Sequence, residues 1–207
     1  MRMRMGEVGK MSVNRVEVLC PGMIVRDGTV VLEARSTATL VSRGERRLLV
    51  DTSGPENRAM LREALLSHGL APSDIGLIVL THAHGDHEGN LGMFPQAKVL
   101  AHRTEGGELT FDGDVEVWEG VRLVHTPGHT PGSISVLVDA GETIAIAGDA
   151  IPTEDNARKW VPPGHHYDRR KAMDSMGMLI EAAEVVVPGH GRAFRTAPYK
   201  EKGRRGE

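Results

Sequence analysis

The chain has 207 residues, of which 40% are hydrophobic and 26% are charged, so it can bury a core beneath a charged surface, and a disordered chain is excluded. Its formal net charge of −3 shows no basic excess of the kind that marks nucleic-acid-binding or membrane-binding domains. The single cysteine, Cys20, excludes an internal disulfide framework, and no apolar run approaches the ~18 residues of a membrane helix. The composition predicts a soluble, cytoplasmic protein with no membrane partner.

The first fifty residues predict β-structure behind a flexible N-terminal tail. Residues 1–12 lack hydrophobic periodicity, which is typical of a frayed terminus. Between Val16 and Val50, the pairs Asp27-Gly28 and Arg43-Gly44 each separate two apolar runs. This arrangement favours a tight turn between two antiparallel strands at each pair.

A helix is predicted over Glu56–Ser67, because Met60, Leu61, Ala64 and Leu65 recur at helical spacing, and Gly69 then marks its end. The continuous apolar run Gly76–His82 predicts a strand that is buried on both faces.

The second half of the chain alternates short apolar runs with one helical segment. A helix is predicted over Asp168–Glu181, and the strands are predicted at Lys98–His102, Val115–His125, Ser133–Asp139, Thr143–Gly148 and Glu184–Val187. This order fits two sheets packed face to face with helices outside. We expect one domain over residues 13–198, followed by a charged C-terminal tail over residues 199–207.

Four candidate metal ligands follow the central buried strand, in the segment THAHGDHEGN. In extended chain, residues two apart point the same way, so His82 and His84 can bind one ion. A turn at Gly85 then directs Asp86 and His87 toward a second ion. Loops at strand ends are where catalytic groups collect on a rigid sheet.

Three later residues, His129, Asp149 and His190, also follow apolar runs and are flanked by Gly, Pro or Thr. Together the seven candidates comprise five histidines and two aspartates, with no thiolate. This donor set suits Zn²⁺ best, with Fe or Mn²⁺ as alternatives. Seven ligands are too many for one tetrahedral ion, and the set predicts two divalent ions that share a bridging carboxylate.

The motifs THxHxDHxGN, VDT (Val50–Thr52), TPGHTPGS, GD (Gly148–Asp149) and PGHG occur in an order that resembles the metallo-β-lactamase superfamily over roughly residues 16–196. Within it, LLVDTSGP and the stretch from LREALL to LGMFP resemble the family of metallo-β-lactamase domain-containing protein 1. The resemblance implies an αββα sandwich of two mainly antiparallel sheets. It also implies the following positions: His82, His84 and His129 at site one; Asp86, His87 and His190 at site two; Asp149 as the bridge; and Asp51 orienting a ligand histidine.

The chain departs from the family pattern in two places. Ser53 stands where the superfamily usually has glycine. The stretch Ile151–Arg169 does not match the subfamily, and substrate loops often lie in this region. Its residues His165, His166 and Tyr167 are therefore candidate substrate contacts.

The resemblance implies metal-assisted hydrolysis, with Asp86 as the catalytic carboxylate that orients the attacking water and passes a proton to the leaving atom. We expect a small ester, thioester or lactone as substrate. A metal-dependent phosphodiesterase or RNA endonuclease is the alternative, with RNA as partner, although the slight negative charge and few aromatic residues argue against it. A mononuclear iron sulfur dioxygenase is a further alternative. The sequence is compatible with a homo-oligomer.

The remaining features have structural interpretations. His68 ends the first predicted helix and is expected to interact with its dipole. His102 and His125 end predicted strands and are expected to be exposed or to position a ligand. The basic runs Arg43–Arg47 and Arg204–Arg205 predict solvated segments.

Overall fold

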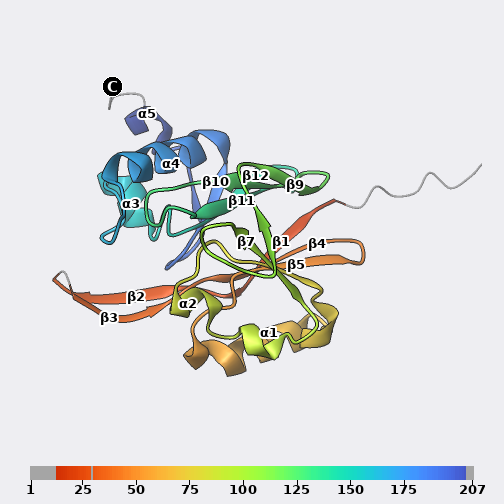
Figure 1. Ribbon diagram of the computed structural model, residues 1–207. Coiled ribbons are helices and arrows are strands. Elements are labelled where there is room, and N and C mark those ends of the chain that lie inside the picture. Colours follow the sequence, from red (N-terminus) through yellow and green to blue (C-terminus); the bar gives the residue numbers. More distant parts are fainter. Residues whose placement is uncertain (1–12, 29, 204–207) are drawn as a thin grey trace, which may run out of the picture.

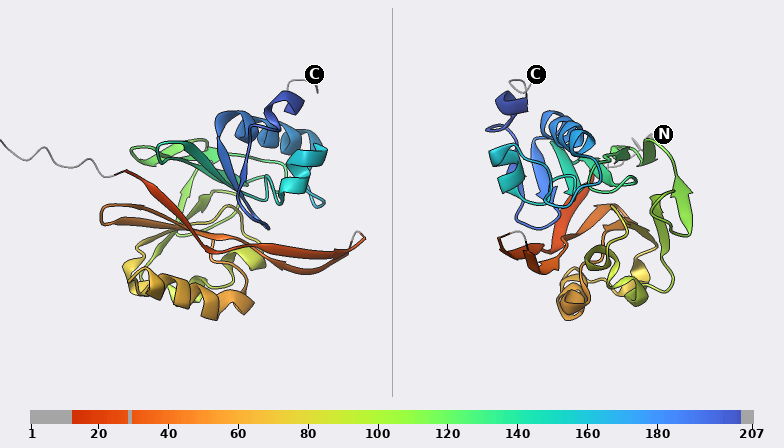
Figure 2. Two further views of the ribbon diagram at one scale, coloured as in Figure 1. Left: turned by 180° about the vertical axis from the view of Figure 1, so that it is seen from behind. Right: turned by 60° about the vertical axis from the view of Figure 1, so that its left-hand side comes forward.

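The computed structural model describes residues 13–28 and 30–203. The predicted N-terminal tail (residues 1–12) and the basic pair Arg204–Arg205 lie outside the described residues. Two six-stranded sheets face each other, and helices cover the outer face of each sheet (Figures 1 and 2). The αββα sandwich expected from the sequence is confirmed.

The first sheet has the strand order β1-β4-β5-β6-β7-β8. Its strands are β1 (Arg15–Cys20), β4 (Ala38–Arg43), β5 (Arg46–Val50), β6 (Leu77–Val79), β7 (Lys98–His102) and β8 (Leu109–Phe111). The pairs β1–β4 and β4–β5 are antiparallel, whereas the pairs from β5 to β8 are parallel. The parallel pairs exist because the chain crosses over between these strands through helices and loops.

The second sheet has the order β14-β13-β12-β11-β10-β9, and all its pairs are antiparallel except β12 with β13. Its strands are β9 (Val115–Trp118), β10 (Val121–His125), β11 (Ile134–Asp139), β12 (Thr143–Gly148), β13 (Val185–Pro188) and β14 (Phe194–Arg195).

The helices divide between the two outer faces (Figure 2). The first sheet is covered by α1 (Arg58–Ser67) and accompanied by the four-residue α2 (Gly85–Glu88) and the 3-10 turns η1 (Pro55–Asn57), η2 (Pro72–Asp74) and η3 (Leu91–Met93). The second sheet is covered by α3 (Glu154–Lys159) and α4 (Arg169–Ala182), with α5 (Lys200–Gly203) at the end of the described chain.

Alternation along the strands produces a central core and two outer ones. In β5, Leu48 and Val50 face the other sheet, whereas Leu49 faces α1. In β11, Val136 packs between the sheets and Leu137 packs under α4. Successive side chains on a strand point to opposite faces, so each sheet buries both of its faces.

A hairpin of β2 (Met23–Asp27) and β3 (Val30–Arg35) projects from the sandwich as a separate two-stranded sheet (Figure 1). Gly28, in the predicted turn, has a φ of 56°, the left-handed conformation that a tight hairpin turn requires. The predicted turn at Gly44, with φ 60°, is likewise confirmed.

Some predicted elements differ from the observed ones. The strand predicted over Val115–His125 is a hairpin, because Gly120 (φ 77°) reverses the chain between β9 and β10. Met60, predicted to pack with the core face of α1, is 44% exposed. The charged tail predicted from residue 199 begins with a buried residue, Tyr199, whose ring packs edge to face on Phe194.

No described helix is long and apolar enough to cross a membrane.

Candidate metal centre

Seven side chains from both sheets converge at one edge of the sandwich. Each follows the end of β6, β10, β12 or β13. Because β10 and β12 are both antiparallel to β11, and β13 is parallel to β12, the carboxyl ends of these three strands lie at the same edge. The structure thus brings together all seven predicted ligands, whose role stays a prediction: His82, His84, Asp86, His87, His129, Asp149 and His190.

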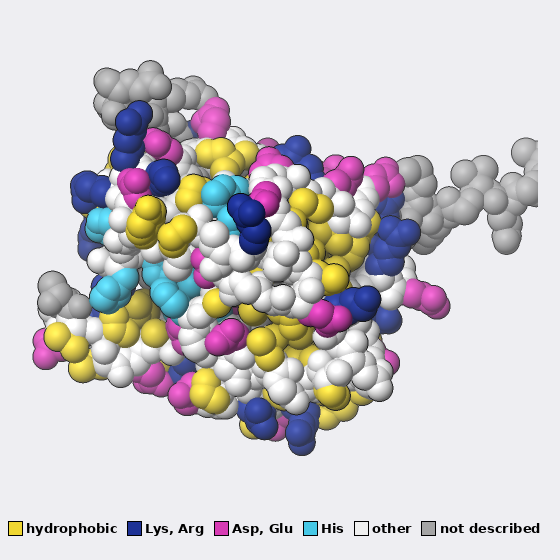
Figure 3. Space-filling view, in the orientation of Figure 1, with side chains coloured by type: hydrophobic (Ala, Val, Ile, Leu, Met, Phe, Trp, Pro, Cys, Tyr) yellow, Lys and Arg dark blue, Asp and Glu magenta, His cyan; other side chains and the backbone are white. Residues whose placement is uncertain are grey.

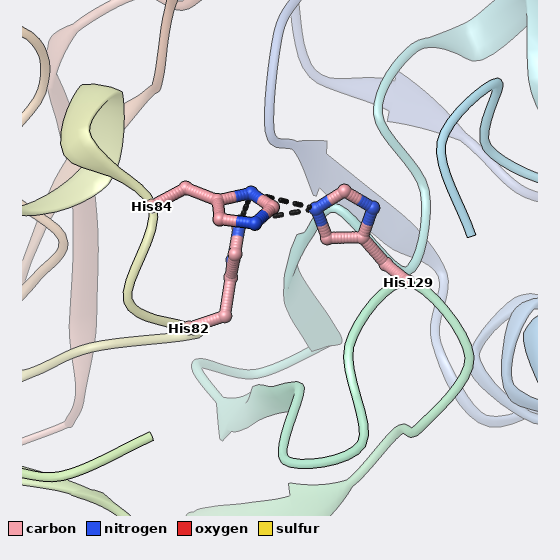
Figure 4. Close-up of side chains that lie close together, drawn as sticks. All are labelled: His82, His84 and His129. Carbon is pink, nitrogen blue, oxygen red and sulfur yellow. Dashed lines mark hydrogen bonds between the residues drawn. The ribbon is translucent and has the colours of Figure 1, made fainter. Parts of the chain in front are cut away.

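Three of these histidines, His82, His84 and His129, form a triangle of ring nitrogens (Figure 4). The Nε2 atom of His129 lies 3.2 Å from His82 Nε2 and 3.0 Å from His84 Nδ1, and the latter two nitrogens are 3.0 Å apart. Two nitrogens that share a tetrahedral zinc ion lie about 3.4 Å apart, since zinc–nitrogen distances are about 2.0–2.1 Å. The triangle therefore has the size of one face of such a shell.

The Asp149 carboxylate lies between this triangle and a second group. Its Oδ2 atom is 3.5 Å from His129 Nε2. Its Oδ1 atom is 3.2 Å from His190 Nε2 and 3.5 Å from His87 Nε2. The carboxylate of Asp86 completes the second group, 3.5 Å from His190 Nε2. One oxygen of Asp149 thus faces each group, which is the arrangement of a carboxylate shared by two cations.

Two glycines allow the loops to approach this closely. A Cβ atom on Gly189 would lie 2.1 Å from Asp149 Oδ1, and one on Gly148 would lie 2.6 Å from the Thr81 side chain. Gly148 also has a φ of 49°, which favours glycine. These contacts explain glycine in the GD and PGHG motifs.

Asp51 holds His87 in place from below the centre. Its Oδ2 atom accepts hydrogen bonds from His87 Nδ1 and from the Thr81 hydroxyl, each at 2.8 Å, and its Oδ1 atom accepts one from the Thr81 N–H at 2.8 Å. With Nδ1 protonated, the Nε2 lone pair of His87 faces the centre. Asp51 itself has a φ of 57°, a conformation uncommon outside glycine that concentrates at functional sites.

Backbone carbonyls orient two further histidines. The Nδ1–H of His129 donates to the His165 carbonyl at 2.7 Å, and that of His190 donates to the Arg35 carbonyl at 2.9 Å. Each bond leaves Nε2 directed toward the centre. The two carbonyls come from the loop before α4 and from the end of β3.

The carboxylates of Asp51 and Asp149 create a negative electrostatic environment around His87 and His190 that a positive charge would stabilise. Burial lowers the pKa of His87, but the charges of Asp51 and Asp149 outweigh it and hold this pKa well above the ordinary value. Burial would raise the pKa of Asp149, yet His190 and His87 keep it well below the usual range. A divalent cation would supply this charge in place of protons.

Two of the candidate ligand atoms also lack hydrogen-bond partners within the described part of the chain, which fits a metal site. Among the described residues, His87 Nε2 and Asp149 Oδ1 are buried side-chain atoms with no hydrogen-bond partner. Such atoms are costly unless a ligand satisfies them. In the triangle, burial and the neighbouring His87 lower the pKa of His82, which favours the neutral imidazole that binds metals.

The candidate substrate loop abuts the centre through its backbone. Besides the His165 carbonyl contact, the Tyr167 N–H donates to the His129 carbonyl at 3.1 Å. The side chains of His165, His166 and Tyr167 are exposed, and the His166 ring donates to the Pro163 carbonyl within the loop. Their contact with substrate stays a prediction.

The other predicted histidines lie outside the centre. His68 follows α1, and its Nδ1–H donates to the Ala64 carbonyl at 2.8 Å, which raises its pKa, as Glu17 does too. His102 is buried, so the prediction of exposure is wrong for this residue. Its ring stacks on His125 at 4.5 Å, because the ends of β7 and β10 meet there.

Sequence reasoning missed Glu105, which joins two of the loops that carry candidate ligands. Its Oε2 atom accepts a hydrogen bond from the Ala83 N–H at 3.0 Å, between His82 and His84 in the chain. Its Oε1 atom accepts from the Thr130 hydroxyl at 2.7 Å and the Gly132 N–H at 3.0 Å. The loop sequence TEGGE carries no spacing signal that could have indicated this role.

Comparison with known proteins agrees with this geometry. The family model described as the metallo-beta-lactamase superfamily matches residues 33–118 and 100–190. The chain belongs to the metallo-β-lactamase superfamily. Metallo-beta-lactamase domain-containing protein 1 of Xenopus laevis is 34% identical over 199 residues, which cover 91% of this chain and 84% of the relative.

Two further similarities concern a metallo-hydrolase and a solved structure. A probable metallo-hydrolase of Methanocaldococcus jannaschii is 30% identical over 189 residues, and the match covers 90% of this chain and 90% of that protein. The crystal structure of a B. thuringiensis AiiA mutant with N-decanoyl-L-homoserine bound at the active site superposes with a TM-score of 0.70 at 21% identity, covering 87% of this chain and 94% of that one. The protein is a metal-dependent hydrolase of this superfamily.

Proposed function

We propose that the protein is a binuclear hydrolase that cleaves a small ester, thioester or lactone. The observation that carries the proposal is the Asp149 carboxylate, with one oxygen toward the three-histidine triangle and the other toward His87 and His190. The triangle would hold one divalent ion, and Asp86, His87 and His190 would hold the other. Zinc suits this donor set best, with iron or manganese as alternatives.

When bound, two divalent cations lower the pKa of water so that hydroxide is available at neutral pH, and they polarise the carbonyl oxygen of the substrate. The chain supplies orientation and proton transfer. The Asp86 side chain is 25% exposed, compared with 11% for Asp149, so Asp86 is the more accessible of these two carboxylates. We assign it the role of orienting the attacking water and passing its proton to the leaving atom.

The loop of His165, His166 and Tyr167 is proposed to contact the substrate, because its backbone already contacts His129. Replacing both His165 and His166 by alanine should raise KM and leave the metal content unchanged. Unchanged kinetics would remove these side chains from the substrate site.

The test is elemental analysis of the purified protein together with hydrolysis rates on thioesters, lactones and phosphodiesters. Two zinc ions per chain and turnover of the first two substrates are expected. His84→Ala should lose activity and one ion, because it removes a vertex of the triangle, and Asp86→Ala should keep at least one ion with little turnover. His68→Ala, outside the centre, is the matched control.

Other outcomes would point to the remaining chemistries. Full metal content and rate in His84→Ala would refute the site assignment. One iron per chain with oxygen uptake on a persulfide would favour a sulfur dioxygenase, and cleavage of phosphodiesters alone would favour a nuclease. The buried, unpaired Cys20 is compatible with the proposed cytoplasmic location, where thiols stay reduced.

A further inference from the structure

A cavity of about 580 Å³ lies between the β2–β3 hairpin and α3. Its walls include Ile24 and Arg26 of β2, Lys159 of α3, the loop residues Val161, Pro162 and Gly164, and the pair Gly191-Arg192. The volume falls in the range of about 300–1,000 Å³ that is typical of small-molecule sites. The space-filling view shows histidine side chains gathered above the projecting hairpin on this side of the molecule (Figure 3).

Two residues of the cavity wall are sequence neighbours of residues at the candidate metal centre. Gly164 in its wall precedes His165, whose carbonyl accepts the hydrogen bond of His129. Gly191 in its wall follows His190. Consecutive Cα atoms are about 3.8 Å apart, so the wall reaches within one residue of a ligand or of its hydrogen-bond partner. A molecule in the cavity could therefore extend to the centre.

The charged side chains that line the cavity differ in whether they have partners of opposite charge. The Asp155 carboxylate pairs with Arg158 and with Lys159, and the Glu154 carboxylate accepts a hydrogen bond from the Tyr199 hydroxyl at 2.7 Å. By contrast, the side chains of Arg26 and Arg192 have no hydrogen bond or ion pair with any residue in ranges 13–28 and 30–203, although the backbone of Arg26 pairs with that of Val31 in the hairpin. Two guanidinium groups thus line one cavity without an anionic partner among the residues that the structure describes.

Arg26 lies directly against the opposite wall. A Cβ atom on Gly164 would come within 2.5 Å of Arg26 Nη1, so the guanidinium reaches from the hairpin to the loop. This contact places a planar, permanently charged donor group at the cavity, and such groups bind carboxylates and phosphates with two parallel hydrogen bonds.

We propose that Arg26 and Arg192 bind an anionic group of the substrate, a carboxylate or a phosphate, while its scissile bond extends to the metal centre. The inference rests on the proposed hydrolase function and narrows its substrates to negatively charged ones. It also assigns the β2–β3 hairpin a role in substrate selection, because one of the two arginines comes from it.

The test compares the purified protein with its variants Arg26→Gln and Arg192→Gln. Arg170→Gln is the control, since the Arg170 side chain is 92% exposed on α4 and lies outside the cavity wall. Binding of glutarate and of inorganic phosphate is measured by calorimetry. Each cavity variant should raise the dissociation constant of at least one anion about tenfold. This factor corresponds to the low end of the free energies that hydrogen bonds to charged groups contribute, because both arginines are exposed to solvent. The control should match the parent protein.

A second arm uses two 4-nitrophenyl esters, the neutral butyrate and the negatively charged monoglutarate. The cavity variants should lower kcat/KM for the charged ester about tenfold and leave the neutral one unchanged. Gly164→Ala keeps every charge but displaces the Arg26 guanidinium, and a smaller loss in the same direction is expected.

The outcomes separate the two proposals. Anion binding that is equal in the parent and in both cavity variants overturns the inference, whatever the rates are. Anion binding that depends on the arginines, with no turnover of either ester, supports the inference and counts against the ester hydrolase. A stronger effect on phosphate than on glutarate supports the subsite and identifies a phosphate-bearing ligand.

Discussion

Asp51→Asn tests whether the carboxylate below the centre sets the protonation of His87. Both side chains are almost completely buried, and their 2.8 Å hydrogen bond joins a ring nitrogen to a carboxylate oxygen. An asparagine oxygen can still accept from the Thr81 N–H, but the amide nitrogen then faces His87 Nδ1, so two donors meet. His87 must lose its partner or move its proton to Nε2, the atom that faces the centre.

The expected cost follows from these contacts. A buried hydrogen bond to a charged group contributes about 1.5–3 kcal/mol. Loss of a carboxylate that orients a metal-binding histidine typically lowers metal affinity about 10–100-fold, which corresponds to about 1.4–2.7 kcal/mol. The two figures agree, and we expect this loss at the ion held by His87 and not at the three-histidine triangle.

The assay is a metal titration against a competing chelator that resolves two binding events. Circular dichroism before the titration confirms that the variant is folded. Asp139→Asn is the matched control, because the Asp139 carboxylate accepts a hydrogen bond in an exposed turn. Two unchanged binding constants in Asp51→Asn would refute the argument that Asp51 prepares His87 for a metal ion.

Three further predictions concern residues outside the ligand set. Glu105→Ala removes three hydrogen bonds between loops that carry candidate ligands, and it should weaken metal binding at the triangle about tenfold in the same titration. Glu108 is exposed in the same loop, so Glu108→Ala should not change the affinity, and equal affinities in the two variants would exclude a positioning role for Glu105. Ser53 has a φ of 59°, a left-handed conformation that glycine adopts without strain. The variants Ser53→Gly and Ser53→Ala both lose the hydroxyl, so the free energy of unfolding in urea should be about 1 kcal/mol higher for the glycine variant, and identical unfolding midpoints would contradict this. Burial raises the pKa of Cys20 to about 11, so about one thiol in a thousand is ionised at pH 8, and iodoacetamide should label it only after unfolding; labelling of the native protein at the rate of the unfolded one would show that Cys20 is accessible.

Much of the candidate site could be predicted from the sequence because its residues follow strand ends. Apolar runs predict strands locally, and a polar residue directly after such a run lies at a sheet edge wherever the strand is placed. His82, Asp149 and His190 each follow a run in this way. Both hairpin turns could be predicted too, since Gly28 and Gly44 permit a backbone conformation that other residues rarely adopt.

The contacts that orient the candidate ligands could not be predicted in the same way, apart from the position of Asp51. Glu105, and the carbonyls of His165 and Arg35, act on residues far from them in the chain, and any residue type provides a carbonyl. The guanidinium groups of Arg26 and Arg192, which pair with no described residue, line one cavity only because the hairpin lies beside the loop after β13. Local patterns determine which residues end a strand, whereas the distances between strand ends depend on how the two sheets pack.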